Sequence, residues 1–303
     1  MWNLPILLAG APVNSVAFSS DDSMLAVGSR GLQLWDPARR SLLTRLPTPG
    51  TTFVNAVAFA PGGRLVAAGY GNGTFQLWRT TGKAPAPLGP ELTASNSGMI
   101  ESVSFSPDGK ILATGGDDGT VRLWSVPPLA SPHAHAVRLL AIRHDSGSYV
   151  FSVAFSPDGD LLAVGSADKT VRLWSVSDPA RPRPLGAPLT GPASYVYSVA
   201  FSPDGKTLAA GVTDGTVWLW NLAVPAHPSL VATITGPNGH VYSVAFSHSG
   251  QVVAAGSADG TVRLWDTSAA QAASAVCANE GQPLSRSAWE TSVPGITYRA
   301  PCS

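Results

Sequence analysis

One short pattern of apolar and polar positions recurs along most of the chain. In the copy from Val196 to Trp220, an apolar, β-branched run (VYSVAFS) leads to the turn sequence PDG, a second apolar run (TLAAG), the turn TDG and a third run (TVWLW). Proline presets φ and glycine accepts positive φ in such turns. The first run is apolar enough to predict a strand buried on both faces. The pattern therefore predicts three strands joined by tight turns.

The pattern occurs six times. The copies begin at Val13, Val54, Ile100, Val150, Val196 and Val241, and they end at Trp35, Trp78, Trp124, Trp174, Trp220 and Trp265. Successive tryptophans are 43, 46, 50, 46 and 45 residues apart. Proline-rich connections between copies hold a further apolar run, most clearly RSLLTRL, HAVRLLAI and PSLVATIT. Four strands per repeat, with no helix between them, predict one blade of a β-propeller per repeat.

The motif SVAFSPDG…LAxG…DGTVRLW resembles that of the WD-repeat (WD40) family, from about Leu4 to Thr267. The resemblance implies an all-β propeller of six four-stranded blades, with seven as the alternative because seven is commoner in the family. It also implies closure by the N-terminal strand, in which Pro5 to Ala9 would pair with the third strand of the sixth blade. We expect a propeller over residues 1–268 and a C-terminal tail over residues 269–303 packed on it.

Blades of this family often carry a polar network of histidine, hydroxyl, aspartate and tryptophan. Here the six tryptophans remain as core residues, and turn aspartates remain as Asp118, Asp168, Asp214 and Asp259. Each aspartate should accept backbone N–H groups of its own turn. The histidine has no equivalent and only Thr114 supplies the hydroxyl, so no complete network is expected. Stability should rest on apolar burial, with one phenylalanine per blade as an anchor: Phe18, Phe59, Phe105, Phe155, Phe201 and Phe246.

The tail contains both cysteines, Cys277 and Cys302. A disulfide between them and two free thiols are both open. We expect a cytoplasmic protein, or an extracytoplasmic one if the pair is oxidised. The tail resembles endings that follow WD repeats in actinobacterial proteins, some of which carry a kinase or NTPase module upstream.

Composition and motifs argue against several functions. Nineteen basic residues balance nineteen acidic ones, without the basic excess of a nucleic-acid-binding protein. No apolar stretch approaches the roughly 20 residues of a membrane-spanning helix. No metal-ligand spacing, nucleophile elbow or phosphate-binding loop is present. We therefore expect no nucleic-acid or membrane partner, no metal or cofactor, and no enzymatic activity.

The residues on either side of the first valine of each repeat vary from copy to copy. In WD-repeat propellers this strand start lies near the mouth of the central channel, where partners commonly dock. The resemblance thus implies partner-binding residues there: Tyr149, Phe151, Tyr195, Tyr197, His240, Tyr242, Glu101, Asn14 and Asn55. Tyrosine combines apolar area with a polar tip at binding surfaces. Packing against a neighbouring blade is the alternative for each ring, and Trp218 is a second candidate.

The leading hypothesis is a monomeric, non-catalytic scaffold that binds a protein or peptide on the propeller face. A second hypothesis is a sensor or regulatory fragment of a larger, kinase- or NTPase-linked signalling protein. A third is a propeller hydrolase whose catalytic site has no recognisable motif.

Overall fold

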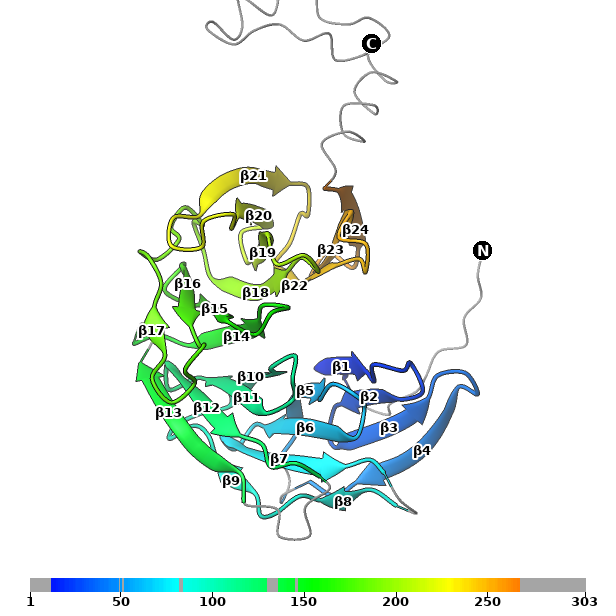
Figure 1. Cartoon of the computed structure of the whole chain (residues 1–303). Coiled ribbons are helices and arrows are strands. Elements are labelled where there is room, and N and C mark those ends of the chain that lie inside the picture. The colour runs from blue at the N-terminus through cyan, green and yellow to red at the C-terminus, as the bar shows by residue number, and fades with distance from the viewer. Residues whose placement is uncertain are drawn as a thin grey trace, which may run out of the picture.

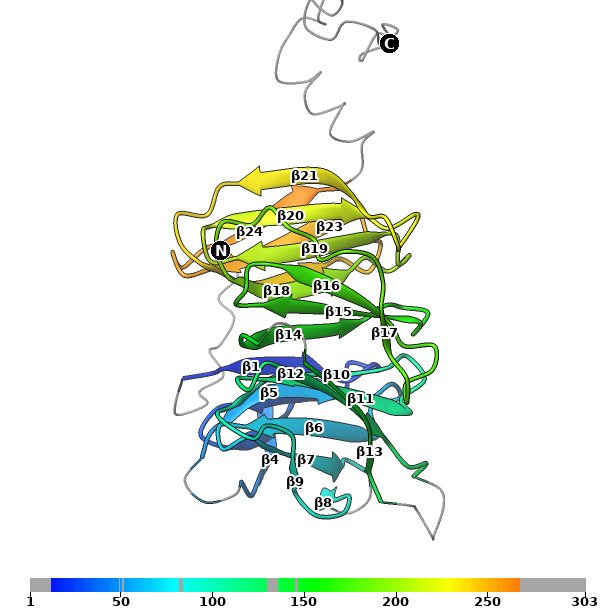
Figure 2. The same cartoon turned by 90° about the vertical axis from the view of Figure 1, so that its left-hand side faces the viewer.

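The structure, a computed structural model, describes residues 12–48, 50, 52–81, 84–129, 136–144 and 147–267. Within these ranges every regular element is a β-strand, and the strands form six antiparallel sheets around a central axis (Figure 1). Figure 2 shows neighbouring sheets stacked on one another along the arc. The protein is a six-bladed β-propeller, as predicted.

Each blade follows the chain from the innermost strand outward. Blade one contains β1 (Ser15–Phe18), β2 (Leu25–Gly28), β3 (Leu32–Asp36) and β4 (Ser41–Leu46). Blade two contains β5 (Val54–Phe59), β6 (Leu65–Tyr70), β7 (Thr74–Arg79), β8 (Ala86–Pro87) and β9 (Leu92–Thr93). Blade three contains β10 (Ile100–Phe105), β11 (Ile111–Gly116), β12 (Thr120–Ser125) and β13 (Arg138–His144).

The other three blades repeat this order. Blade four contains β14 (Val150–Phe155), β15 (Leu161–Ser166), β16 (Val171–Ser175) and β17 (Arg183–Pro184). Blade five contains β18 (Val196–Phe201), β19 (Thr207–Val212), β20 (Thr216–Asn221) and β21 (Ser229–Thr235). Blade six contains β22 (Val241–Phe246), β23 (Val252–Ser257) and β24 (Val262–Asp266). Four blades thus have four strands, while blade two divides its outer strand in two and the described part of blade six has three.

Side-chain hydrogen bonds fix the turn between the first two strands of a blade. In blade three, Ser106 Oγ donates to Asp108 Oδ1 at 2.7 Å, and the Lys110 N–H donates to the same oxygen at 3.0 Å. The Ser106 bond, together with the other bonds to the carboxylate, keeps the pKa of Asp108 below its usual range. Gly109 follows at φ 69°, a left-handed conformation that glycine adopts without strain. The PDG sequence therefore stops one strand and directs the next back along it.

In blades one to five the second strand is buried on both faces, and in blades one and three the third strand is buried almost as fully. In β11 only Ile111 is partly exposed, whereas three of the six residues of β10 are half-buried. The prediction that the first strand is buried on both faces is therefore wrong. The first strand is innermost, so one of its edges faces the central channel (Figure 1).

Blades pack through a glycine on the second strand. A Cβ on Gly115 would lie 2.5 Å from Val150 Cγ1 and 3.2 Å from Val153 Cγ1 in the next blade, so only glycine permits this approach. Beside this contact the Val153 N–H donates to Ser102 Oγ at 3.0 Å. The same close contact recurs at four other interfaces, at Gly28 with Val54, Gly69 with Ile100, Gly165 with Val196, and Gly211 with Val241. These interfaces form the apolar core.

The predicted phenylalanine anchors occupy this core in five blades. Phe105 is buried, and partly buried phenylalanines pack against the core clusters at positions Phe59, Phe155, Phe201 and Phe246. Phe18 differs, because 57% of its surface is exposed. Its role as a core anchor is therefore not realised in the described part of the chain. The predicted tryptophans are buried in blades one to five, and Trp265 in blade six is half-buried.

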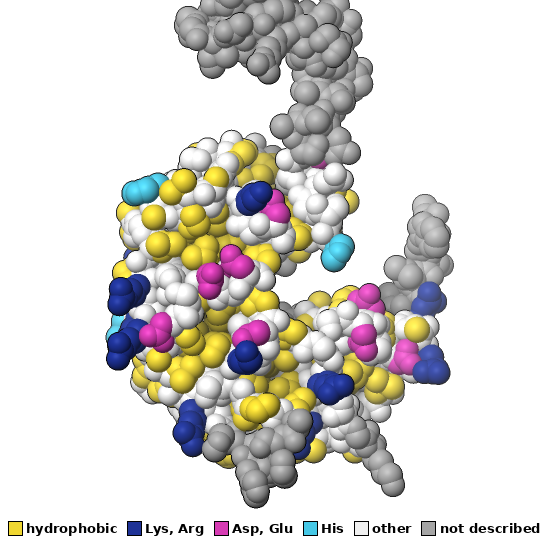
Figure 3. Space-filling model, viewed as in Figure 1, with side chains coloured by type: hydrophobic (Ala, Val, Ile, Leu, Met, Phe, Trp, Pro, Cys, Tyr) yellow, Lys and Arg dark blue, Asp and Glu magenta, His cyan; other side chains and the backbone are white. Residues whose placement is uncertain are grey.

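Blades one and six do not form the contact that joins the other blades. Among the described residues, apart from its chain neighbours, nothing lies within 4 Å of the place where a Cβ on Gly256 would stand. Val13 is 48% exposed on blade one, and Val262 is 72% exposed on blade six. Figure 3 shows an opening between the two ends of the arc. We call the facing surfaces of blades one and six the open interface. Pro5 to Ala9, predicted to close the ring, lie outside the described residues.

Candidate binding site at the mouth of the channel

A β-bulge at the start of the first strand supplies the residues of the mouth. In blades two to six the pairing with the second strand skips the residue after the first valine, for example between Val150 and Ser152. A bulged residue leaves the ladder and its side chain is redirected. In this way Phe151 on β14 turns toward the channel rather than into the sheet. The sequence does not predict this bulge, because the first apolar segment of each repeat is equally compatible with a regular strand.

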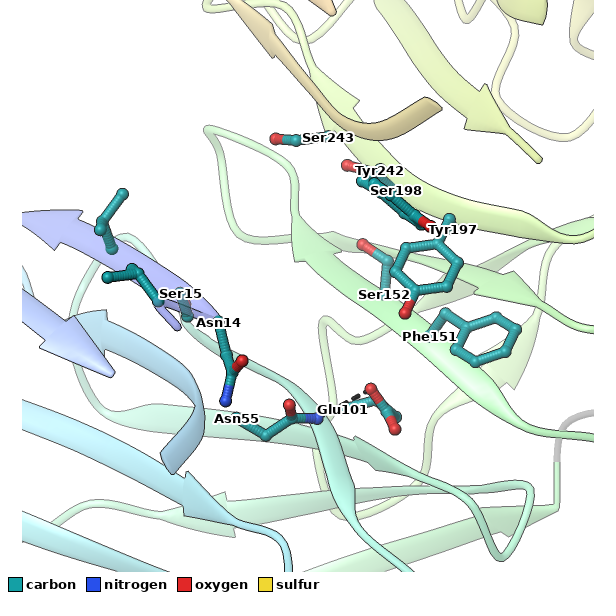
Figure 4. Close-up of a pocket in the computed structure, with 12 residues that line it drawn as sticks. Asn14, Ser15, Asn55, Glu101, Phe151, Ser152, Tyr197, Ser198, Tyr242 and Ser243 are labelled. Carbon is teal, nitrogen blue, oxygen red and sulfur yellow. Dashed lines mark hydrogen bonds between the residues drawn. The ribbon is translucent and has the colours of Figure 1, made fainter. Parts of the chain in front are cut away.

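The five bulged side chains and Asn14 of blade one surround one cavity. Its volume is about 420 Å³, and residues of all six blades line it. The position after the first β-branched residue of each repeat contributes one of these side chains per blade: Asn14, Asn55, Glu101, Phe151, Tyr197 and Tyr242. Figure 4 shows the two asparagines and Glu101 on one side and the three rings on the other. The mouth therefore has a polar half, contributed by blades one to three, and an aromatic half, contributed by blades four to six.

The aromatic half is a continuous run of rings. Phe151 stacks on Tyr197 with centroids 4.7 Å apart and planes 18° apart, and Tyr197 meets Tyr242 edge-on at 5.1 Å. Such geometries stabilise aromatic pairs beyond simple burial. Mutual packing therefore fixes the wall before any partner arrives. The packing alternative holds for Tyr197 and Phe151, which are half-buried.

The residues preceding the first valine lie on the outer rim. Tyr149 is 52% exposed and Tyr195 is 48% exposed, and each ring stands 6.1 Å from Phe151. His240 is exposed, stands 5.9 Å from Tyr242, and its Nδ1 contacts the carbonyl of Thr213. All nine predicted partner-binding residues thus lie at one end of the channel, six lining the cavity and three on the rim.

Hydrogen bonds between blades hold the polar half. Asn14 Nδ2 donates to the carbonyl of Val54 at 3.1 Å, and Asn55 Nδ2 donates in the same way to Ile100 at 3.3 Å. Asn55 Nδ2 also donates to Glu101 Oε2 at 2.8 Å. Each asparagine therefore binds the blade that follows it, and Asn55 also orients Glu101, the next side chain of the mouth.

Glu101 lies beside Asp117, which belongs to the turn between β11 and β12. Burial, the negative charge of Asp117 and a hydrogen bond with that carboxyl raise the pKa of Glu101 to about 7, against a smaller opposing effect of the Asn55 bond. Burial and the charge of Glu101 also raise the pKa of Tyr197 across the cavity. The mouth therefore changes charge near neutral pH. Sequence reasoning missed Asp117, because the contact joins residues from different elements.

Comparison with protein families settles what the repeats are. The model of the family "WD domain, G-beta repeat" (WD40) matches residues 6–36, 40–79, 89–125, 137–175, 184–221 and 228–266, which is more than half of the chain. The chain belongs to the WD40 family. The WD40 propeller is commonly used for protein–protein interaction, and the family is generally a non-catalytic scaffold. A search of curated proteins found no match for this chain.

The turn aspartates of the WD40 blades accept more bonds than their own turns supply. Asp118 Oδ1 accepts the N–H and hydroxyl of Thr120 at 3.1 and 2.6 Å, and its Oδ2 accepts the N–H of Asn96, 22 residues upstream, at 2.9 Å. Asp214 and Asp259 receive matching upstream bonds from the backbones of Ala193 and Asn238. In blade four, the N–H and the hydroxyl of Thr170 donate to Asp168 Oδ1 in the same way as those of Thr120 donate to Asp118. The aspartates therefore fix the connection that leads to the mouth.

An arginine two positions before the tryptophan neutralises three of these aspartates. Arg122 Nη2 lies 2.8 Å from Asp118 Oδ2, with both side chains less than a tenth exposed, and the corresponding Arg172–Asp168 pair is about a fifth exposed. Burial would raise the pKa of Asp118, but bonds from Arg122, Thr120 and Asn96 outweigh it and lower that pKa. Arg263 pairs with Asp259 in blade six.

Trp218 replaces this arginine in blade five. Its Nε1 donates to Thr216 Oγ1 at 2.9 Å, and its ring stacks on Trp220 with centroids 5.9 Å apart. A Cβ on Gly191 would lie 2.5 Å from the Trp218 ring. Trp218 thus packs against Trp220 and the connection that contains Gly191, and it is not among the residues that line the mouth cavity.

Indole N–H groups find different acceptors in different blades, as expected of an incomplete WD40 network. The bonds run from Trp124 to Thr114 Oγ1 at 3.1 Å, from Trp78 to Tyr70 Oη at 3.4 Å, and from Trp35 to Gln33 Oε1 at 3.0 Å.

Among the described residues, no three side chains of histidine, cysteine, aspartate or glutamate come together as metal ligands. The described part of the chain also contains no helix long and apolar enough to cross a membrane. Cys277 and Cys302 lie outside the described residues.

Proposed function

We propose that this WD40 propeller is a non-catalytic scaffold whose channel mouth binds a peptide segment of a protein partner. The observation that carries the proposal is the aromatic half of the mouth. There, Tyr149, Tyr195 and Tyr242 each leave about half of their surface in solvent although they touch other rings. Exposed aromatic groups that form one patch support a binding surface more strongly than scattered ones do.

The charge of the mouth suggests which side chains the peptide presents. Among the residues lining the cavity, Glu101 is the one with an ionisable carboxyl, and none is Lys or Arg. A basic side chain could lie between Glu101 and the ring faces, where the carboxylate and the aromatic quadrupoles both favour a cation. An acidic side chain would meet Glu101 and Asp117 and be repelled. The preferred peptide therefore carries apolar and basic residues.

The test uses a random peptide library displayed on phage and selected on the intact protein. Changing Tyr149, Tyr195 and Tyr242 together to serine should remove binding of the selected peptides by more than about tenfold, because aromatic anchors contribute most of the energy of such contacts. A matched control, Leu230→Ser with Val231→Ser, removes exposed apolar groups from β21 on the outside of blade five.

The control should bind the selected peptides as the unchanged protein does. Selected sequences should be rich in basic and apolar residues and poor in acidic ones. Equal binding by all three proteins, or a selection dominated by acidic peptides, would contradict the proposal.

A further inference from the structure

The five interfaces between neighbouring blades show which residues become buried when one blade packs against the next. At each, the first β-branched residue of the following blade is fully buried, as Val54 and Val150 are at 0% exposure, whereas Val13 is 48% exposed. Three residues further on, Val153 and Val199 are 4% and 6% exposed, whereas Val16 is 58% exposed. Val13 and Val16 of blade one therefore correspond to residues that are buried in the other blades, but no described blade packs against them.

Blade six also exposes apolar residues that are buried in other blades. Val262 and Leu264 are 72% and 67% exposed on β24, while the equivalent Val171 and Leu173 of blade four are 0% and 3% exposed. The open interface is therefore apolar on both sides.

At the inner edge of the open interface, a serine hydroxyl also lacks, among the described residues, the hydrogen bond that its equivalent makes between other blades. At the interface of blades five and six, Ser198 Oγ accepts the N–H of Val244 at 3.1 Å. Ser243 is the equivalent of Ser198 in blade six, and it is exposed beside the mouth cavity. Within the described residues no N–H donates to its hydroxyl.

Both ends of the described chain border this interface. Residue 267 follows β24 directly, and residue 12 precedes the first exposed valine of blade one. Residues 268–303 therefore begin at the apolar face itself, and they include the large apolar residues Val276, Leu284, Trp289, Val293, Ile296 and Tyr298. A tethered segment has an effective concentration on the order of millimolar. It should therefore occupy the face ahead of a second copy of the chain.

We propose that residues 268–303 dock into the open interface and bury the apolar faces of blades one and six. This covering replaces the missing blade contact at Gly256, where no described residue beyond the chain neighbours lies within 4 Å of a built Cβ. The tail is then a structural part of the propeller, and the proposal is independent of what the mouth binds.

The experiment measures the reaction of a single introduced thiol with a maleimide. In a full-length background carrying Cys277→Ser and Cys302→Ser, the reporter is Val262→Cys on blade six. The control is Val231→Cys, which replaces a 60% exposed valine on β21 of blade five. If the interface is covered for more than nine-tenths of the time, the reporter should react at least about tenfold more slowly than the control, because labelling then requires opening.

Two changes to the tail test its role. Trp289→Ser with Val293→Ser in the full chain should speed labelling of the reporter and leave the control unchanged, and ending the chain at Thr267 should abolish protection. The double substitution keeps the test valid if the shortened chain does not fold, which circular dichroism reports. Fast labelling in the full chain would overturn the proposal. So would protection that survives both changes, as direct packing of blade six on blade one or pairing of residues 1–11 with β24 predicts. Protection that rises with protein concentration, as a second copy predicts, would overturn it too.

Discussion

The raised pKa of Glu101 predicts how the stability of the folded protein changes with pH. Glu101→Gln preserves the shape of the side chain, and its amide oxygen can still accept the bond from Asn55 while its NH₂ donates to Asp117. What the change removes is the charge. Since that charge is desolvated and faces a second carboxylate, its removal should stabilise the folded protein wherever Glu101 is ionised.

The sign and the size follow from the pKa. Between pH 4.5, the ordinary value for glutamate, and about 7, the folded protein holds a proton that the unfolded chain has lost. The free energy of unfolding of the unchanged protein therefore falls as pH rises through this window. At 1.36 kcal/mol per pKa unit the full effect would be about 3 kcal/mol, and because water enters the mouth we expect about 1–2 kcal/mol.

The assay is urea unfolding of both proteins from pH 4 to pH 8 at constant ionic strength. The two free energies should agree near pH 4, and the Glu101→Gln variant should be more stable by about 1–2 kcal/mol at pH 8. Glu91→Gln, at an exposed glutamate between β8 and β9, is the control and should follow the unchanged protein. If all three curves run parallel, Glu101 does not carry the coupled, desolvated charge described above.

Two further predictions concern the blades themselves. Arg122→Ala should lower the free energy of unfolding by about 3–5 kcal/mol, because it leaves Asp118 buried without its cation. Arg172→Ala, in a more exposed pair, should lower it by about 1 kcal/mol. Equal losses for the two variants in denaturant unfolding would contradict the burial argument. Lys169 has φ 72° where other blades have glycine, so Lys169→Gly should stabilise by about 0.5–1 kcal/mol, and a lowered melting temperature would refute this.

The mouth shows how far sequence reasoning reached and where it stopped. The variable positions around the first valine were recognisable because they change inside a constant repeat, and all of them lie at one end of the channel. Their division into lining and rim residues depends on the bulge in each first strand, which a run such as VYSVAF does not reveal. The pairing of Glu101 with Asp117 also escaped prediction, because two carboxyls 16 residues apart come together only when a hairpin folds back.

By itself the sequence determined the repeats, the strands, the turns and the propeller, because these follow from local chemistry. Proline and glycine set turn dihedrals, β-branched runs favour strands, and six similar copies impose one architecture. Tertiary structure alone decided how deeply each strand is buried, how the mouth divides into polar and aromatic halves, and which interface stays open in the described part of the chain. Those features depend on contacts between blades, such as Gly115 against Val150, and no single repeat contains both sides of such a contact.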